Sequence, residues 1–315
     1  MKRIISVLLG LISFVALLTA QNNNPGLDSL SQLSRHGQLP QLIQAANSLL
    51  AGGNLSSSDK GIALTYLAYG YQQSGDLHHA VASYEQALAV INRDGLHTAE
   101  YATALAALAT LYAESGAIDT AKHVLLRSIH IFEQQGDHAA IAGLWNDLAT
   151  IAADEHSSRD AHKYLAHALA ESQLAGNITQ DQLAAITSTQ ARIAQLDGDP
   201  TSAISDYQRS LALWKQSHGD QQPQTGWLYV LLGEAWLQSG NIAAAHDATL
   251  HGLQILQATS GDRTPRFFAA QLAYSKILDA SGSHAEASTL RTSANSGLTD
   301  LTRASQNQIS ISALR

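Results

Sequence analysis

Apolar and polar residues follow one another along most of this chain with the period of an α-helix. In one clear stretch Leu64, Leu67, Ala68 and Tyr71 stand at positions i, i+3, i+4 and i+7, a spacing that places all four side chains on one face of a helix. Gly75 follows, and a second stretch of the same periodicity begins directly after it. Because glycine favours the left-handed backbone that often ends a helix, the pattern predicts two amphipathic helices joined by a short turn.

This turn returns along the chain at a nearly constant interval. It consists of a glycine with a small residue five positions later, and its copies are Gly75/Ala80, Gly116/Ala121, Gly198/Ala203, Gly240/Ala245 and Gly282/Ala287, with His156/Ala161 as a degenerate copy. The alanines are 41, 40, 42, 42 and 42 residues apart. Such a period is typical of solenoids, in which each unit buries its apolar face against its neighbours. The sequence therefore predicts an all-α solenoid of antiparallel helix hairpins.

Residues that favour the start of a helix accompany these turns. Their side-chain oxygens can accept hydrogen bonds from the free amide groups of the first helical turn. They are Asp76, Asp199 followed by Pro200, Asn241, Ser283 with Glu286, Ser157 with Asp160, Thr179 with Gln182, and Thr264 followed by Pro265. We expect twelve helices in six pairs over residues 57–294.

The repeats resemble the tetratricopeptide repeat, whose pattern is a large apolar residue, a small one, an aromatic, glycine, alanine, an aromatic and alanine. The matches in the first, second and fifth repeats are Leu67, Ala68, Tyr71, Gly75, Ala80, Tyr84 and Ala87, then Leu108, Ala109, Tyr112, Gly116, Ala121, Leu125 and Ser128, and then Leu232, Gly233, Trp236, Gly240, Ala245, Thr249 and Gly252. The longer interval is similar to that of kinesin light chains and of many bacterial members. The resemblance implies a right-handed superhelix with a wide, deep groove.

In this family the first helix of each pair lines the concave face, where partners bind. Counting offsets within the repeat assigns to that face Tyr69, Gln72, Gln73, Thr110, Glu114, Asn146, Thr150, Ser188, Arg192, Gln195, Trp227, Glu234, Leu272, Lys276 and Asp279. The set is polar and rich in amides, which fits an extended peptide better than the two-lysine, two-asparagine clamp of chaperone-binding members. The alternative is that many of these residues are ordinary solvated helix surface. Trp227 is either an anchor for a partner or a contact within the core.

The first twenty residues have the pattern of an export signal. Lys2 and Arg3 precede the mainly apolar stretch from Ile4 to Leu18, and Ala20 provides a small residue at a cleavage site. We expect a mature chain that starts near Gln21 and is periplasmic or secreted. No cysteine is present, so the protein is not expected to be a lipoprotein, although an uncleaved signal that acts as a membrane anchor stays as an alternative.

The parts of the chain outside the full repeats are assigned as follows. Residues 21–26 are expected to form a linker, residues 27–56 a truncated repeat that caps the solenoid, and residues 295–315 a terminal tail. In this tail Ile309 and Ile311 alternate with serines, which is the period of a strand. Three alternatives are open for Ile309, Ile311 and Leu314: they cover the last repeat, they pair with a strand of a partner, or they are frayed.

Composition excludes several classes of function. The chain has 45% hydrophobic, 6% aromatic and 14% charged residues and a formal net charge of -8, which argues against a surface for nucleic acid or anionic lipid. Of its fourteen histidines, His162 and His167 are five positions apart and so point about 140 degrees away from each other on a helix. No metal-ligating, nucleotide-binding or nucleophile motif is present. We expect no enzyme, no metal and no cofactor.

Two functional hypotheses are compatible with these features. The first is an exported scaffold that binds an extended peptide segment of a protein partner in its concave groove. The second is a structural subunit of an envelope assembly that docks or self-associates through the exposed ends of the solenoid.

Overall fold

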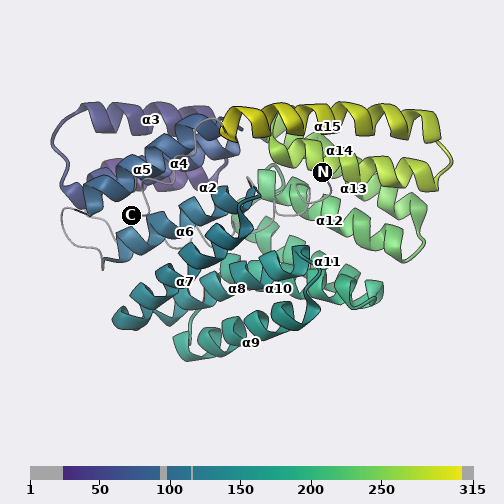
Figure 1. Cartoon of the computed structure of the whole chain (residues 1–315), viewed down its shortest axis with the longest axis horizontal. Coiled ribbons are helices and arrows are strands. Elements are labelled where there is room, and N and C mark those ends of the chain that lie inside the picture. The colour runs from purple at the N-terminus through teal and green to yellow at the C-terminus, as the bar shows by residue number, and fades with distance from the viewer. Residues whose placement is uncertain (1–23, 93–97, 115, 307–315) are drawn as a thin grey trace.

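The protein is an all-α solenoid, described here by a computed structural model for residues 24–92, 98–114 and 116–306 (Figure 1). All regular elements in these residues are helices. They are α2 (Pro25–Arg35), α3 (Leu39–Ala51), α4 (Ser57–Gln73), α5 (Leu77–Ile91), α6 (Ala99–Glu114), α7 (Ile118–Gln135), α8 (His138–Asp154), α9 (Ser158–Ala175), α10 (Gln180–Leu196), α11 (Pro200–His218), α12 (Pro223–Gln238), α13 (Ile242–Ser260), α14 (Pro265–Ala280) and α15 (His284–Gln306). The predicted fold class is confirmed.

The turns between paired helices have the backbone that the repeating glycines predicted. Gly75, for example, has φ +81°, its N–H donates to the carbonyl of Gln72 and the N–H of Asp76 donates to that of Tyr71, so the last carbonyls of α4 are satisfied. The equivalent glycines have φ values between +82° and +89°. His156 occupies the degenerate copy with φ +59° and is the one non-glycine residue with positive φ among the described residues.

The predicted helix caps are confirmed at most positions. Asp76, Asp199 and Asn241 each accept a hydrogen bond from a first-turn amide at 3.1–3.2 Å, and Thr179 forms a complete capping box with Gln182. The weaker box predicted at Ser157 does not form. Its hydroxyl donates to the Asp160 carboxylate at 2.9 Å, and no side chain caps the first turn of α9.

The ends of the repeat region differ from the expected boundaries. Asn24 caps α2, which starts at Pro25, so the last two residues of the predicted linker belong to a helix. Residues 27–51 form a short hairpin of α2 and α3, in addition to the six hairpins from α4 to α15. At the other end α15 continues past residue 294 without a break, and Leu298 is buried beside Phe268. The signal segment and the Ile309–Leu314 stretch lie outside the described residues.

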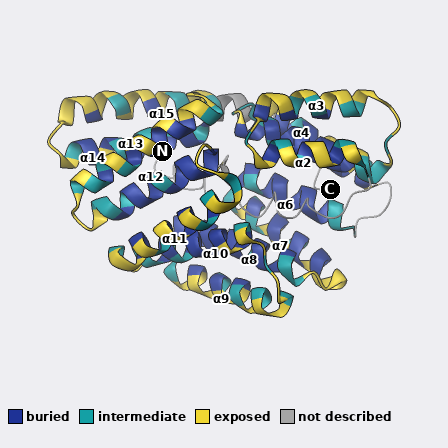
Figure 2. Ribbon diagram, turned by 180° about the vertical axis from the view of Figure 1, so that it is seen from behind, coloured by how far each residue is buried: buried dark blue, intermediate teal, exposed yellow. Residues whose placement is uncertain are grey.

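The small residue of each turn motif lies at the contact between the two helices of its hairpin. The six alanines Ala80, Ala121, Ala161, Ala203, Ala245 and Ala287 are all fully buried. In the α12–α13 hairpin the approach is closer still, because a Cβ atom added to Gly252 would lie 2.5 Å from the carbonyl oxygen of Gly226. Buried residues run along the first helices of the hairpins, while exposed residues gather on the outer helices (Figure 2).

The solenoid turns far enough for its first hairpins to reach its last ones, which the sequence did not predict. A Cβ atom added to Gly75 would lie 2.9 Å from the carbonyl oxygen of Arg263, and one added to Gly37 would touch the side chain of Gln222. In Figure 1 the ends of α3 and α15 meet at the top of the molecule, and α15 also contacts α5. The concave face is therefore enclosed on all sides in this plane.

The register of the repeats predicts the cost of enlarging a buried alanine. Replacement Ala245→Leu adds three carbon atoms at the α12–α13 contact, where the Ala245 carbonyl already lies 3.0 Å from the position of a Cβ on Gly233. We expect the free energy of unfolding to fall by about 1 to 3 kcal/mol, measured by urea denaturation. Ala243→Leu, at an exposed position of the same helix, is the control and should change stability little. Equal stability of the two variants would contradict the assigned register.

Candidate functional site

Three charged side chains of alternating sign lie on successive first helices. Arg192 on α10, Glu234 on α12 and Lys276 on α14 are each separated by 42 residues. Because this interval is one repeat, the three side chains occupy equivalent positions on stacked helices. Glu234 lies between the two cations, with Arg192 Nη1 at 3.7 Å from one carboxylate oxygen and Lys276 Nζ at 2.9 Å from the other. We call these three residues the charge ladder.

A buried carboxylate, Asp154, continues the ladder at the end of α8. Arg192 Nε and Nη2 lie 3.1 and 3.0 Å from Asp154 Oδ1, while Asp154 Oδ2 has no hydrogen-bond partner among the described residues. The Asp154 side chain is only 1% exposed. Burial disfavours the ionised carboxylate and raises the pKa of Asp154 to about 7, although the positive charge of Arg192 opposes this shift.

The other members of the ladder keep their charges. Burial alone would raise the pKa of Glu234, but Lys276 and Arg192 together hold the pKa of this carboxylate below its ordinary value. Burial alone would lower the pKa of Arg192, but Asp154, Tyr207 and Glu234 raise it instead. The ladder is therefore ionised at neutral pH. Exposure increases along it, because Arg192 and Glu234 are about one-fifth exposed and Lys276 is 59% exposed.

The ladder lines a cavity of about 450 Å³ on the first helices. The lining residues are Ala153, His156, Arg192, Gln195, Leu196, Glu234, Leu237, Gln238 and Lys276. Gln195 accepts from the Tyr207 hydroxyl at 2.8 Å, and Gln238 donates to the Gln195 carbonyl at 3.0 Å, so the two amides are held in place. Fixed amides, balanced charges and two leucines suit a short polypeptide segment better than a single ion.

Four of the predicted groove residues meet at this cavity: Arg192, Gln195, Glu234 and Lys276. They come from three consecutive first helices, as the offsets within the repeat predicted. Asp279 lies one turn further along α14, but there it pairs with Arg291 and His284.

The remaining predicted residues lie elsewhere and are largely covered. Gln72 accepts from the Tyr84 hydroxyl and donates to Thr110, and Gln73 lies 3.5 Å from Arg266. Thr150 bonds Thr189. Tyr69 lines a small cavity of about 30 Å³ beside Gln73. Asn146, Ser188, Trp227 and Leu272 are buried, and the Glu114 side chain lies outside the described part of the chain.

Trp227 is a core residue in this structure. It is 5% exposed and belongs to the apolar cluster of residues 184–273. Of the two alternatives for this residue, the packing favours the core contact. A binding role for the covered residues stays a prediction, because a partner could reach them only if the solenoid opened.

Sequence reasoning did not place Asp154 and His156 at this site. Both were considered only as parts of a metal site, and in the described residues no group of three or more His, Cys, Asp or Glu is arranged to hold a metal ion. The useful signal was the alternation of charge at an interval of one repeat. Leu196, Leu237 and Gln238 carried no comparable signal, since they lie at the ends of helices whose neighbours only the fold defines.

The raised pKa of Asp154 predicts a pH-dependent stability. Between about pH 4 and pH 7 the folded chain holds a proton on Asp154 that the unfolded chain has already released, so the free energy of unfolding should fall as pH rises through this window and be constant above it. Asp154→Asn removes the titration. The stability of the wild type relative to Asp154→Asn, measured by urea denaturation, should therefore be lower at pH 8 than at pH 4.5.

The exposed residue Asp119 provides the control for this experiment. The difference between wild type and Asp119→Asn should show no comparable fall over the same pH range. A wild-type advantage over Asp154→Asn that grows with pH would show that Arg192 outweighs burial.

Comparison with known proteins agrees with the repeat architecture. A family model for the tetratricopeptide repeat matches residues 182–258, which span α10 to α13 almost completely. A search of curated proteins found no similar sequence. No helix in the described residues is both long and apolar enough to cross a membrane.

Several solved structures are similar to this chain. The signal transduction ATPase with a tetratricopeptide repeat sensor from Pyrococcus horikoshii aligns with a TM-score of 0.52 at 11% identity, over 86% of this chain and 42% of that one. BtubC from P. vanneervenii gives 0.47 at 20% identity, over 73% and 92% of the two chains. The kinesin light chain TPR-like repeats of Podosopora anserina give 0.44 at 17% identity, over 63% and 95%.

At these identities a likeness indicates a shared fold and says nothing about ligands. The fold itself is generally a non-catalytic scaffold for protein interactions, because stacked hairpins present extended surfaces. The match to the repeat family, the seven helix hairpins of the described residues and the buried alanine at each of six turns agree with one another. The chain is a tetratricopeptide repeat protein.

Proposed function

We propose that this protein is an exported scaffold that binds an extended peptide segment of a partner protein on its concave face, at the cavity beside the charge ladder. The observation that supports this most strongly is the cavity itself. It brings together four residues that the repeat pattern assigned to the binding face, and it contains polar groups already held in position. Such groups can bind a peptide backbone with little loss of side-chain freedom.

The charge ladder is suited to a segment of mixed polarity. Glu234 is neutralised by two cations, so a peptide meets no large field of one sign. Lys276 is the most exposed member of the ladder and pairs only with Glu234, which makes it the cation best able to contact a bound segment. Leu196 and Leu237 provide apolar contacts within the same cavity.

The alternative hypothesis, assembly through exposed ends of the solenoid, has less support. The first hairpins contact the last ones through Gly37 and Gly75, so part of the surface that the hypothesis requires is used within the molecule. No other feature of the described residues favours it.

The binding proposal can be tested without a known partner. Peptides selected from a phage-displayed random twelve-residue library on the purified protein serve as probes, and their affinity is measured by fluorescence anisotropy. Lys276→Glu removes the exposed cation and should weaken binding about tenfold or more, equivalent to about 1.4 kcal/mol, with an unchanged circular dichroism spectrum. Lys163→Glu, on the outer helix α9 and exposed, is the matched control and should leave the affinity unchanged.

Two results would contradict binding at the cavity. One is full affinity in Lys276→Glu, and the other is failure of the library to yield any peptide that binds. A stable homo-oligomer of the pure protein in light scattering would instead support the assembly hypothesis.

Export is a separate part of the proposal and rests on the pattern of residues 1–20. The full sequence, produced in a bacterial host, should appear outside the cytoplasm with an intact mass that corresponds to a chain starting near Gln21. Substitution of Ala20 by a bulky residue should block cleavage, because the site requires a small side chain. A cytoplasmic protein that retains Met1 would contradict export.

A further inference from the structure

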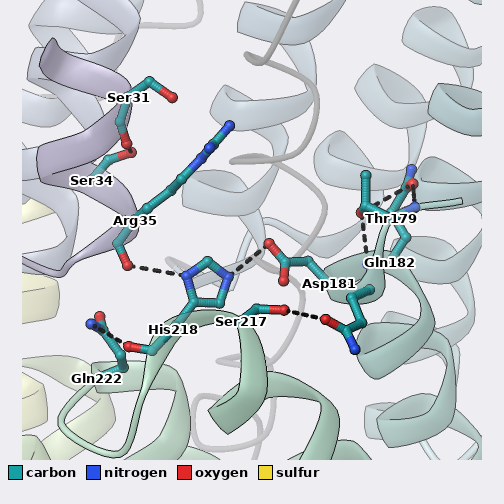
Figure 3. A network of polar contacts seen from close by, with 10 residues as sticks. Ser31, Ser34, Arg35, Thr179, Asp181, Gln182, Ser217, His218 and Gln222 are labelled. Atoms are coloured by element: carbon teal, nitrogen blue, oxygen red, sulfur yellow. Dashed lines mark hydrogen bonds and ion pairs between the residues drawn. The ribbon is translucent and has the colours of Figure 1, made fainter. Parts of the chain in front are cut away.

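The contact between the first and last hairpins contains a histidine that joins segments 183 residues apart. His218, at the end of α11, has its Nδ1 atom 3.2 Å from the carbonyl oxygen of Arg35 at the end of α2. Its Nε2 atom lies 2.8 Å from Asp181 Oδ2 on α10, and its ring stacks on Trp214 with centroids 4.2 Å apart. Figure 3 shows the ring between Arg35 and Asp181. The side chain is 5% exposed.

Two glycines allow the backbones to approach on either side of this histidine. Gly37 and Gly75 have φ +64° and +81°, a conformation that side-chain-bearing residues rarely adopt. Gly37 lies against Gln222 and Pro223, and Gly75 lies against Arg263 and Thr264.

The remaining polar contact across this junction is long. Arg266 Nη1 lies 3.5 Å from the side-chain oxygen of Gln73 on α4 and 3.4 Å from that of Gln224 on α12. We call the contacts made by Arg35, Gly37, Gln73 and Gly75 with α11, α12 and α14 the closure contact.

The closure contact lacks the apolar packing that joins consecutive hairpins. One buried apolar cluster runs from Leu27 to Ile151 and another from Ala184 to Ala273. A smaller cluster of residues 149–193 lies between them along the chain. No cluster in the described residues contains members from both the first and the last hairpins. Apolar burial is the main stabilising term in folding, so the closure contact is the weakest link around the ring and can break while every hairpin stays folded.

We propose that the closure contact is a gate that controls access of a partner segment to the concave face, an inference that rests on the proposed function. In the closed ring a polypeptide can reach the concave face only by passing a free end through the ring. In the open ring an internal segment, with folded domains on both sides, can enter laterally. His218 holds the gate closed, because it connects α2 to α10 and α11 at one point.

The gate can be observed directly, without a ligand. The chain has no cysteine, so Gln41→Cys on α3 and Ser296→Cys on α15, both exposed, place two spin labels at the ends that meet in Figure 1. Pulsed electron spin resonance should give mainly one short distance. His218→Phe keeps a ring to stack on Trp214 but loses both nitrogen contacts, and it should raise the population at longer distances at least tenfold.

A matched histidine provides the control. His162 makes a similar contact, 2.7 Å from Asp197 Oδ2, between neighbouring hairpins away from the closure contact. His162→Phe should leave the distance distribution unchanged. If His218→Phe does not fold, Gln222→Ala, which removes the side chain facing Gly37, replaces it with the same expected shift. Equal distributions in the wild type and in the folded closure variant would overturn the proposal.

Controlled access is tested with the peptide from the phage selection, used both free and inserted between two folded domains. The cysteines at positions 41 and 296 are joined by a bis-maleimide to lock the ring. The locked protein should bind the free peptide with unchanged affinity and bind the flanked peptide at least tenfold more slowly than the unlocked protein. Equal rates for the flanked peptide would overturn the gate, whereas failure of the free peptide to bind any form would overturn the proposed function, with the spin-label result still deciding whether the ring opens.

Discussion

Close contact between the two helices of each hairpin is the constraint on which this protein depends. The contact is made where a helix turns back on its predecessor, and the residue there is a fully buried alanine in six hairpins. A larger side chain would separate the helices, and the left-handed residue that precedes each contact would then no longer direct the chain back along the first helix. Stability in this chain comes from many such contacts, because it has no cysteine for disulfides.

The charge ladder is a consequence of the same repetition. A fixed interval of 42 residues stacks equivalent positions, so charges of alternating sign at that interval meet their neighbours across helices. Glu234 therefore satisfies both Arg192 and Lys276, although the three residues are far apart in sequence. The cost of this order falls on Asp154, which is buried at the end of the ladder with one oxygen unsatisfied.

The closure contact has a different physical character from the rest of the ring. Consecutive hairpins share apolar clusters, whereas the first and last hairpins meet through His218, two glycines and long polar contacts. A repeat protein distributes its stability between neighbours along the chain, and the two ends of such a chain are not neighbours. The ring therefore combines a stable wall with a weak junction, and this difference makes a gate physically reasonable.

Sequence alone determined the architecture of the hairpins. The turns at Gly75 and its equivalents, the caps at Asp76, Asp199 and Asn241, and the buried alanines all followed from local rules, because each depends on residues within a few positions of one another. The degenerate turn at His156 was also predicted correctly, and the structure gives it the same positive φ as the glycines.

Tertiary structure decided what the concave face is. Counting offsets identified Arg192, Gln195, Glu234 and Lys276 as inward-facing, but it could not show that Trp227 packs in the core or that Gln72 and Gln73 are covered. Those outcomes depend on how far the superhelix turns in seven hairpins, a sum of small rotations that no single repeat encodes. The contact of His218 with Arg35 arises from the same sum, so only the folded chain could reveal it.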